Sequence, residues 1–346
     1  MINKSLFDIS WKVDEDTYRS NEALSYSTLS RFEKLGFNGL KHLFDKVETV
    51  SLTFGSAVDS IITGGRAEFN DRFMVSDYPE VSPSIKQIAD ILFERYKDVY
   101  TSLEDIPDND IIEVTENVKY YPNWRPVTRA KVIREQGSNY YKLLYLAKDK
   151  TIIDTNTYKS VLDTVDALKT SEATRYYFQE DNPFEDIERL YQLKFKATFD
   201  NVKYRCMADL IIIDHKNKTI QPIDLKTSSK PEWDFYKSFI EWNYQIQARL
   251  YWRIISDNVK KDEYFKDFEV CPYKFIVVNK DTLHPLVWEF SKTTYYGSLY
   301  FGKKEQIELI DPFILGKELT YYLETNAEVP LKILNENNLE EYLNTL

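Results

Sequence analysis

The 346-residue chain is poor in glycine and cysteine, and each shortage excludes a kind of site. It has nine glycines and contains neither G-x-x-x-x-G-K-[ST] nor G-x-G-x-x-G, so we expect no ATP bound through a P-loop. Its two cysteines, Cys206 and Cys271, are too few for a typical iron–sulfur cluster or an all-cysteine zinc site. They supply no disulfide framework either, which fits a reducing cytoplasm.

Net positive charge and long apolar runs are also missing. The formal net charge is −11, which argues against a protein that coats nucleic acid over its whole surface. A local basic patch or an acidic metal site remains compatible with this charge. No stretch reaches about 18 consecutive apolar residues, and the start has no apolar run of signal-peptide length. We therefore expect a soluble cytoplasmic protein without membrane association.

Hydrophobic residues make up 43% of the chain, enough for a sizeable core. Apolar residues at helical spacing predict helices within residues 25–45, 51–64, 83–103 and 155–178. We expect Ser27 to be the N-cap of the first of these helices. Residues 104–117 are acidic and are predicted to form a loop. The first half of the chain is therefore expected to be mainly helical.

From about residue 187 the pattern changes to strands. Three alternating segments (187–199, 202–214 and 218–227) are separated by short turns, which predicts an antiparallel meander. A helix within 232–257, two strands within 272–291 and a mainly helical region over 293–324 follow. This order predicts an α/β protein with a mixed sheet flanked by helices. We expect a helical region over 1–180, a sheet core over 181–325 and a tail over 326–346, joined in one domain. His215, in a turn, is expected to be exposed.

Two carboxylates and a lysine stand out on the predicted strands. Asp224 and Lys226 are two positions apart, so their side chains point to the same face, between apolar neighbours. Asp209 lies on the preceding strand, and the two carboxylates would repel each other without a cation. Carboxylates bind Mg²⁺ or Mn²⁺, and a nearby lysine can orient water and balance charge during phosphodiester hydrolysis. The alternative interpretation is a buried Asp–Lys salt bridge at a sheet edge.

Several segments, in order, resemble one nuclease family. The segments are SYSTLSRFEK, FGSAVDSIIT, AEFNDRFMV, MADLIIID, IQPIDLKT, YQIQARLYW, KFIVVNKDTLHPLVWEFS and FGKKEQIELIDPFI. Over about residues 25–320 they are similar to the exonuclease VIII (RecE)-like and lambda-exonuclease-like branch of the PD-(D/E)XK superfamily, which includes phage exonucleases. The resemblance implies the restriction-endonuclease-like core fold. It also implies that Asp209 and Asp224 bind the metal, with the Leu225 carbonyl as a further ligand, and that Lys226 is the catalytic lysine.

Four more residues take roles from the same resemblance. Gln247 and Tyr251, at i and i+4 on one helix, resemble the family's Q-x-x-x-Y motif and would position DNA or the active site. Asp59 stands where the family often has histidine and would be an additional metal ligand. Glu188 resembles a position that is often acidic in relatives and would be a further metal ligand. Each residue also has an ordinary interpretation, as a solvated acid for Asp59 and Glu188 and as a packed helix pair for the other two.

Residues 118–142 are rich in basic and aromatic side chains. The candidates for contact with nucleic acid are Trp124, Arg125, Arg129, Lys131, Arg134 and Lys142. They would place cations on phosphates and rings on bases. The alternative is a solvated surface with packed tyrosines.

Taken together, the residues and the resemblance predict a Mg²⁺- or Mn²⁺-dependent, ATP-independent DNA nuclease. The resemblance implies a double-strand exonuclease in recombination or phage genome processing, in a bacterial or phage-infected cell. DNA, further copies of the chain, and a single-strand annealing or recombinase protein are the expected partners. Two alternatives stay open, a structure-specific endonuclease on the same core and a non-catalytic DNA-binding protein. The intact Asp209, Asp224 and Lys226 argue against the second.

Overall fold

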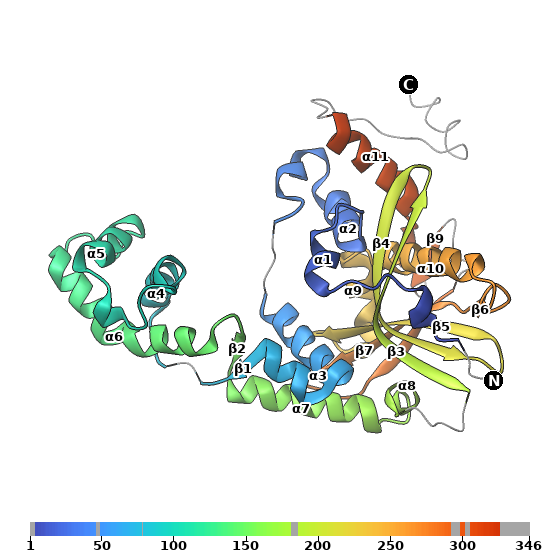
Figure 1. The fold of residues 1–346 in the computed structure, drawn as a ribbon, viewed down its shortest axis with the longest axis horizontal. Helices are drawn as coiled ribbons and strands as arrows, with labels where there is room; N and C mark the ends of the chain where they lie inside the picture. The colour runs from blue at the N-terminus through green and yellow to red at the C-terminus, as the bar shows by residue number, and fades with distance from the viewer. Residues whose placement is uncertain are drawn as a thin grey trace. The chain divides into compact units, whose positions relative to one another are not determined.

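A computed structural model describes residues 4–45, 49–77, 79–180, 186–291, 298–301 and 305–325 (Figure 1). The chain forms two compact units, Met1–Thr63 with Asp163–Leu346, and Gly64–Leu162. The boundary predicted near residue 180 came from the change between helical and strand patterns in the sequence. The two units of the structure are instead defined by which residues contact each other. Among the described helices, none is both long enough and apolar enough to span a bilayer.

A mixed sheet is the centre of the first unit. Its strands run in the order β3 (Ile187–Phe199), β4 (Val202–Asp214), β5 (Thr219–Ser228), β7 (Tyr273–Asn279) and β8 (Leu286–Phe290), and β6 (Glu269–Val270) also pairs with β5. The β3–β4–β5 meander is antiparallel, as predicted, while β5 and β7 are parallel. Asp200 and Asn201 both have positive φ, which a two-residue hairpin turn requires. The predicted mixed sheet with flanking helices is confirmed.

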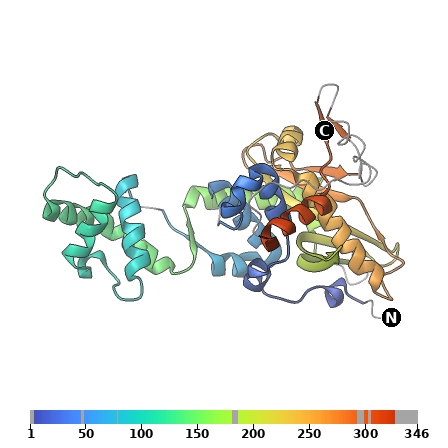
Figure 2. The ribbon, with the colours of Figure 1, turned by 90° about the horizontal axis from the view of Figure 1, so that it is seen from above.

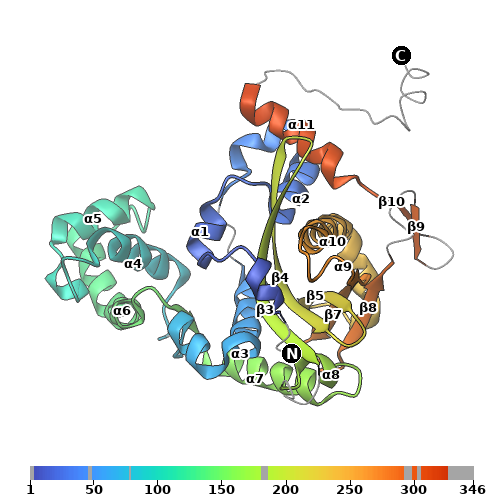
Figure 3. The ribbon, with the colours of Figure 1, turned by 45° about the vertical axis from the view of Figure 1, so that its right-hand side comes forward.

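Helices cover both faces of this sheet (Figure 3). On one face, α10 (Tyr244–Lys261) packs on β3 and β4, with α2 (Tyr26–Leu35) and α11 (Pro312–Thr325) beside it. On the other face lies the first part of α3 (Val50–Arg72), where a Cβ on Gly55 would be 3.1 Å from Thr227 Oγ1. The glycine therefore lets α3 approach β5 closely, just beyond Lys226. The remaining elements of this unit are η1 (Leu6–Ile9), α1 (Glu15–Ser20), η2 (Phe37–His42), α8 (Arg175–Phe178), η4 (Glu232–Asp234), α9 (Phe235–Glu241), β9 (Ser298–Phe301) and β10 (Glu305–Glu308).

Three local predictions for this unit are corrected. Ser25, and not Ser27, is the N-cap of α2, because its side chain accepts a hydrogen bond from the Thr28 amide. The predicted helical region 293–324 contains the antiparallel pair β9–β10 before α11, with 293–297 and 302–304 outside the described residues. The His215 side chain is only 6% exposed, because its ring lies among Tyr264, Phe265 and Phe268. The tail 326–346 lies outside the described residues.

The second unit is a small helical bundle with its own core. It contains α4 (Pro83–Tyr96), η3 (Leu103–Asp105), α5 (Asp108–Asn117) and α6 (Pro126–Ala147), whose apolar faces pack together (Figure 2), and a short parallel pair, β1 (Phe73–Val75) and β2 (Thr151–Ile153). The α7 helix (Thr155–Thr170) crosses the boundary between the units. The predicted loop over 104–117 is wrong, because α5 forms there. Asp108 and Asp110 stand in its first turn, where the helix dipole favours acids, and Ile111 and Val114 are buried.

Candidate functional site

The candidate site lies where β4 and β5 separate. Their ladder runs from the pair Asp214–Thr219 to the pair Leu210–Ile223, while β5 continues beside β7 as far as Ser228. Asp209 and Asp224 are the next residues beyond the last β4–β5 pair. Asp209 Oδ2 accepts a hydrogen bond from the Leu225 amide at 2.9 Å. The Asp209 carboxylate thus accepts the hydrogen bond of a β5 amide that has no backbone partner on β4, because the β4–β5 ladder has ended.

Asp224 and Lys226 lie on the same side of β5, facing α10. Asp224 is 2% exposed, and its Oδ1 accepts a hydrogen bond from Gln247 Nε2 at 2.5 Å. Its other oxygen lies 2.6 Å from Lys226 Nζ, which also sits 4.5 Å from the centroid of the Tyr244 ring. The structure therefore brings four of the predicted residues together: Asp209, Asp224, Lys226 and Gln247.

Negative charge dominates this group. Burial raises the pKa of Asp209 well above its usual range, and the charges of Asp224 and Asp59 raise it further. Burial, the largest single influence, disfavours the Lys226 ammonium, but the charges of Asp224, Tyr244, Tyr26 and Asp209 together outweigh it and raise the lysine pKa. Lys226 is thus held in its protonated form, and one ammonium faces more than one carboxylate. Such an excess of buried negative charge is costly unless a cation balances it.

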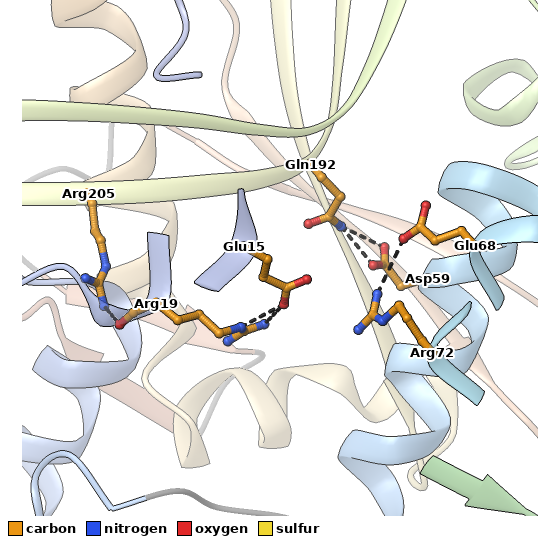
Figure 4. A network of polar contacts seen from close by, with 7 residues as sticks. All are labelled: Glu15, Arg19, Asp59, Glu68, Arg72, Gln192 and Arg205. Atoms are coloured by element: carbon orange, nitrogen blue, oxygen red, sulfur yellow. Dashed lines mark hydrogen bonds and ion pairs between the residues drawn. The ribbon is translucent and has the colours of Figure 1, made fainter. Parts of the chain in front are cut away.

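Asp59 reaches this region from α3 and is held by Gln192 of β3 (Figure 4). Gln192 Nε2 lies 3.0 Å from Asp59 Oδ1 and 2.9 Å from Oδ2. Gln192 stands opposite Asp209, between the ladder pairs Tyr191–Leu210 and Leu193–Ala208, and its φ is 50°. The sequence analysis did not identify Gln192. A glutamine within an alternating strand gives no signal of a left-handed backbone or of a partner 133 positions away.

Other predicted residues lie beside this group or outside it. Tyr251 is buried with its ring 6.2 Å from that of Tyr273, and burial, followed by neighbouring groups that include both site carboxylates, raises its pKa. Glu188 pairs with Ile213, four positions along the ladder from Asp209. Its carboxylate accepts a hydrogen bond from Ser5 Oγ at 2.5 Å and lies 3.7 Å from His215 Nε2. Glu188 thus has its own partners, four ladder positions from Asp209, and its role as a metal ligand stays a prediction.

The two carboxylates of this group are candidate ligands for a divalent cation. Among the described residues, no group of three or more His, Cys, Asp or Glu side chains is arranged to hold a metal ion. Mg²⁺, however, commonly uses one or two carboxylates and completes its octahedron with water and substrate phosphate. Asp209 and Asp224 supply two such hard oxygen donors. Gln247 Oε1 is also buried beside them and accepts no hydrogen bond from the described residues. The donor set therefore fits one Mg²⁺ or Mn²⁺.

The basic residues of the second unit fall into two groups. Arg129 is 4% exposed and ion-paired with Glu116 at 3.0 Å. Arg134 forms an ion pair with Asp108 and donates to the carbonyls of Leu103 and Ile106. Arg129 is buried and Arg134 is half-buried, and their partners lie within the unit, which disfavours both as nucleic-acid contacts. In contrast, Trp124, Arg125, Lys131 and Lys142 are exposed, and Trp124 stacks on Tyr121 with ring centroids 4.5 Å apart.

Comparison with solved structures finds distant likenesses. No family model matches the chain, and no curated protein matches it. Among solved structures, a protein from Eubacterium rectale named "Putative exonuclease" is similar over 92% of this chain and 84% of its own, with 14% identity and a TM-score of 0.39. At this distance the likeness establishes no family. The fold and the site define a mixed α/β protein with a carboxylate–lysine site where two strands separate.

Proposed function

We propose that the chain is a divalent-metal-dependent, ATP-independent DNA nuclease centred on Asp209, Asp224 and Lys226. The supporting observation is the pair of carboxylates on two separating strands, Asp224 buried and Asp209 half-buried, with Lys226 Nζ 2.6 Å from the Asp224 carboxylate. This is the D…D-x-K pattern of the PD-(D/E)XK nucleases that the sequence resembles. A plain buried salt bridge would need only Asp224 and Lys226 and would leave the half-buried Asp209 carboxylate beside them unexplained.

Each residue has a distinct part in this proposal. Asp209 and Asp224 would hold the cation, which when bound stabilises charge on the phosphate and activates water. The Leu225 amide faces Asp209, and the carbonyl of a strand residue points to the same edge as its amide, so Leu225 could add an oxygen ligand. Lys226 is protonated, and we assign it to stabilising developing negative charge on the phosphate. Gln247 fixes the orientation of the Asp224 carboxylate.

Exposed residues of the second unit are proposed to contact DNA. Arg125, Lys131 and Lys142 would bind phosphates, and the Trp124–Tyr121 stack would contact an unpaired base.

The substrate form and the cellular role are proposed from the family resemblance. We propose that the protein is an exonuclease on double-stranded DNA and acts in recombination or phage genome processing, in the cytoplasm of a bacterium or infected cell. Self-association and an annealing or recombinase partner belong to the same proposal. An endonuclease on this core and a DNA-binding protein without activity are the competing functions.

Digestion of linear and closed-circular duplex DNA with Mg²⁺ or Mn²⁺ tests the proposal. We expect wild type to degrade only the linear form, and Lys226→Ala to lower the rate by about 100-fold or more, since it removes a charge from the reacting phosphate. Lys237→Ala is the matched control, because Lys237 is an exposed lysine paired with Asp234. Cutting of both DNA forms would establish an endonuclease. If wild type cuts neither form with either metal, the nuclease proposal is wrong.

A further inference from the structure

We infer that Gln192 keeps Asp59 out of the metal's coordination shell, so that the centre takes one cation, held by Asp209 and Asp224. The inference rests on the proposed function and departs from the role that the family resemblance gives Asp59. It makes Gln192 and Asp59 positioning residues, and it makes Gln192 the residue that sets how many cations bind.

The geometry of the amide carries the inference. Gln192 Nε2 is almost equally distant from the two oxygens of Asp59, at 3.0 and 2.9 Å. It therefore sits between them, on the side of the carboxylate where a bidentate cation would sit. An N–H donor and a metal ion are both positive and compete for the same lone pairs. Asp59 can coordinate in this way only after Gln192 has moved.

The backbone at Gln192 is arranged for this contact. Its φ of 50° lies in the left-handed region, which costs a residue with a side chain about 1 kcal/mol or more. The residue stands in the middle of β3, where regular strand geometry is available to its neighbours. The distortion interrupts the β3–β4 ladder opposite Asp209, between the pairs Tyr191–Leu210 and Leu193–Ala208. A strained residue facing a candidate catalytic carboxylate is typical of a functional constraint.

Asp59 still acts on the centre through its charge. It is bonded to Gln192, which stands opposite Asp209 in the β3–β4 ladder. Held by Gln192, it adds to the negative potential that attracts a cation without becoming a ligand. Removing the Asp59 charge should therefore weaken cation binding modestly, and removing Gln192 should open the bidentate position on the Asp59 carboxylate to a cation.

Calorimetric titration of the full chain with MnCl₂ tests this inference, with the number of bound ions as the readout. We expect wild type and Asp59→Asn to bind one Mn²⁺ each. Gln192→Gly should bind a second Mn²⁺ or bind the first at least tenfold more tightly, and Gln192→Gly/Asp59→Asn should lose that gain. Glycine is the chosen replacement because it adopts a φ of 50° without strain, and circular dichroism melting confirms that each variant is folded.

Two results would overturn the inference. One is a second Mn²⁺ in wild type that disappears in Asp59→Asn, which would make Asp59 a ligand. The other is unchanged binding in folded Gln192→Gly. Asp209→Asn separates this inference from the proposed function. We expect it to abolish Mn²⁺ binding, and if it binds Mn²⁺ as wild type does, the proposed centre itself is wrong, whatever Gln192 does.

Discussion

At the scale of the residue, Asp209 combines burial with negative charge in a way that folding alone does not favour. Its carboxylate gains one backbone hydrogen bond from Leu225, while Asp224 and Asp59 lie close enough to raise its pKa. Residues that cost stability in this way are found where function requires them. The chain keeps the arrangement although an uncharged side chain of the same shape would fold more easily.

We expect Asp209→Asn to stabilise the metal-free protein by about 1 kcal/mol at pH 7. The raised pKa means that the folded wild type binds this proton more tightly than the unfolded chain does. This proton therefore contributes its full stability to folded wild type below about pH 4, near the ordinary aspartate pKa. The contribution is lost as the pH rises through the raised pKa of Asp209 in the folded state. Asparagine has no such loss. Melting curves in EDTA from pH 4 to 7 should show the gain growing with pH, and a variant less stable than wild type at pH 7 would contradict this account.

At the scale of the element, α6 shows that a basic helix can be part of a core. Arg129 and Arg134 lie on the side of α6 that meets α5 and the segment before it, where Glu116 and Asp108 pair with them. Lys131 lies between them in sequence but is 73% exposed, with only a loose contact to Glu135 at 3.6 Å. The side of α6 on which a basic residue lies, and not its charge, therefore distinguishes the residues that stabilise the unit from the candidate DNA contacts.

Arg134→Gln should destabilise the second unit by about 2 kcal/mol, since it leaves the Leu103 and Ile106 carbonyls without their charged donor. Lys131→Gln is the matched control on the same helix and should change stability by less than about 0.5 kcal/mol. Hydrogen exchange of the α5 and α6 amides measures the effect within this unit. Equal protection in the two variants would show that Arg134 is not structural.

At the scale of the whole molecule, the sequence predicted the parts that depend on local pattern. The meander over 187–228 follows from alternating side chains and two short turns, and Asp224 and Lys226 share a face because strands have a period of two. The closeness of Asp209 to Asp224 followed from the same strand register.

Other features depend on contacts that no local pattern reveals. The left-handed backbone of Gln192 occurs opposite Asp209, where the side chain bonds to Asp59 of α3, and neither neighbour is near it in sequence. The position of Arg134 depends on its hydrogen bond to the segment before α5. The α5 helix itself was not predicted, because its acidic residues were interpreted as a solvated loop. Both errors arose because charge was interpreted without knowing which surfaces meet.

The central claim is that Asp209 and Asp224 hold one divalent cation, and a crystal structure of the full chain soaked in Mn²⁺ tests it most directly. The anomalous difference map should show a single peak within coordination distance of both carboxylates, with Asp59 still bonded to Gln192. The absence of a peak there at saturating Mn²⁺, or a peak elsewhere in the chain alone, would contradict the account.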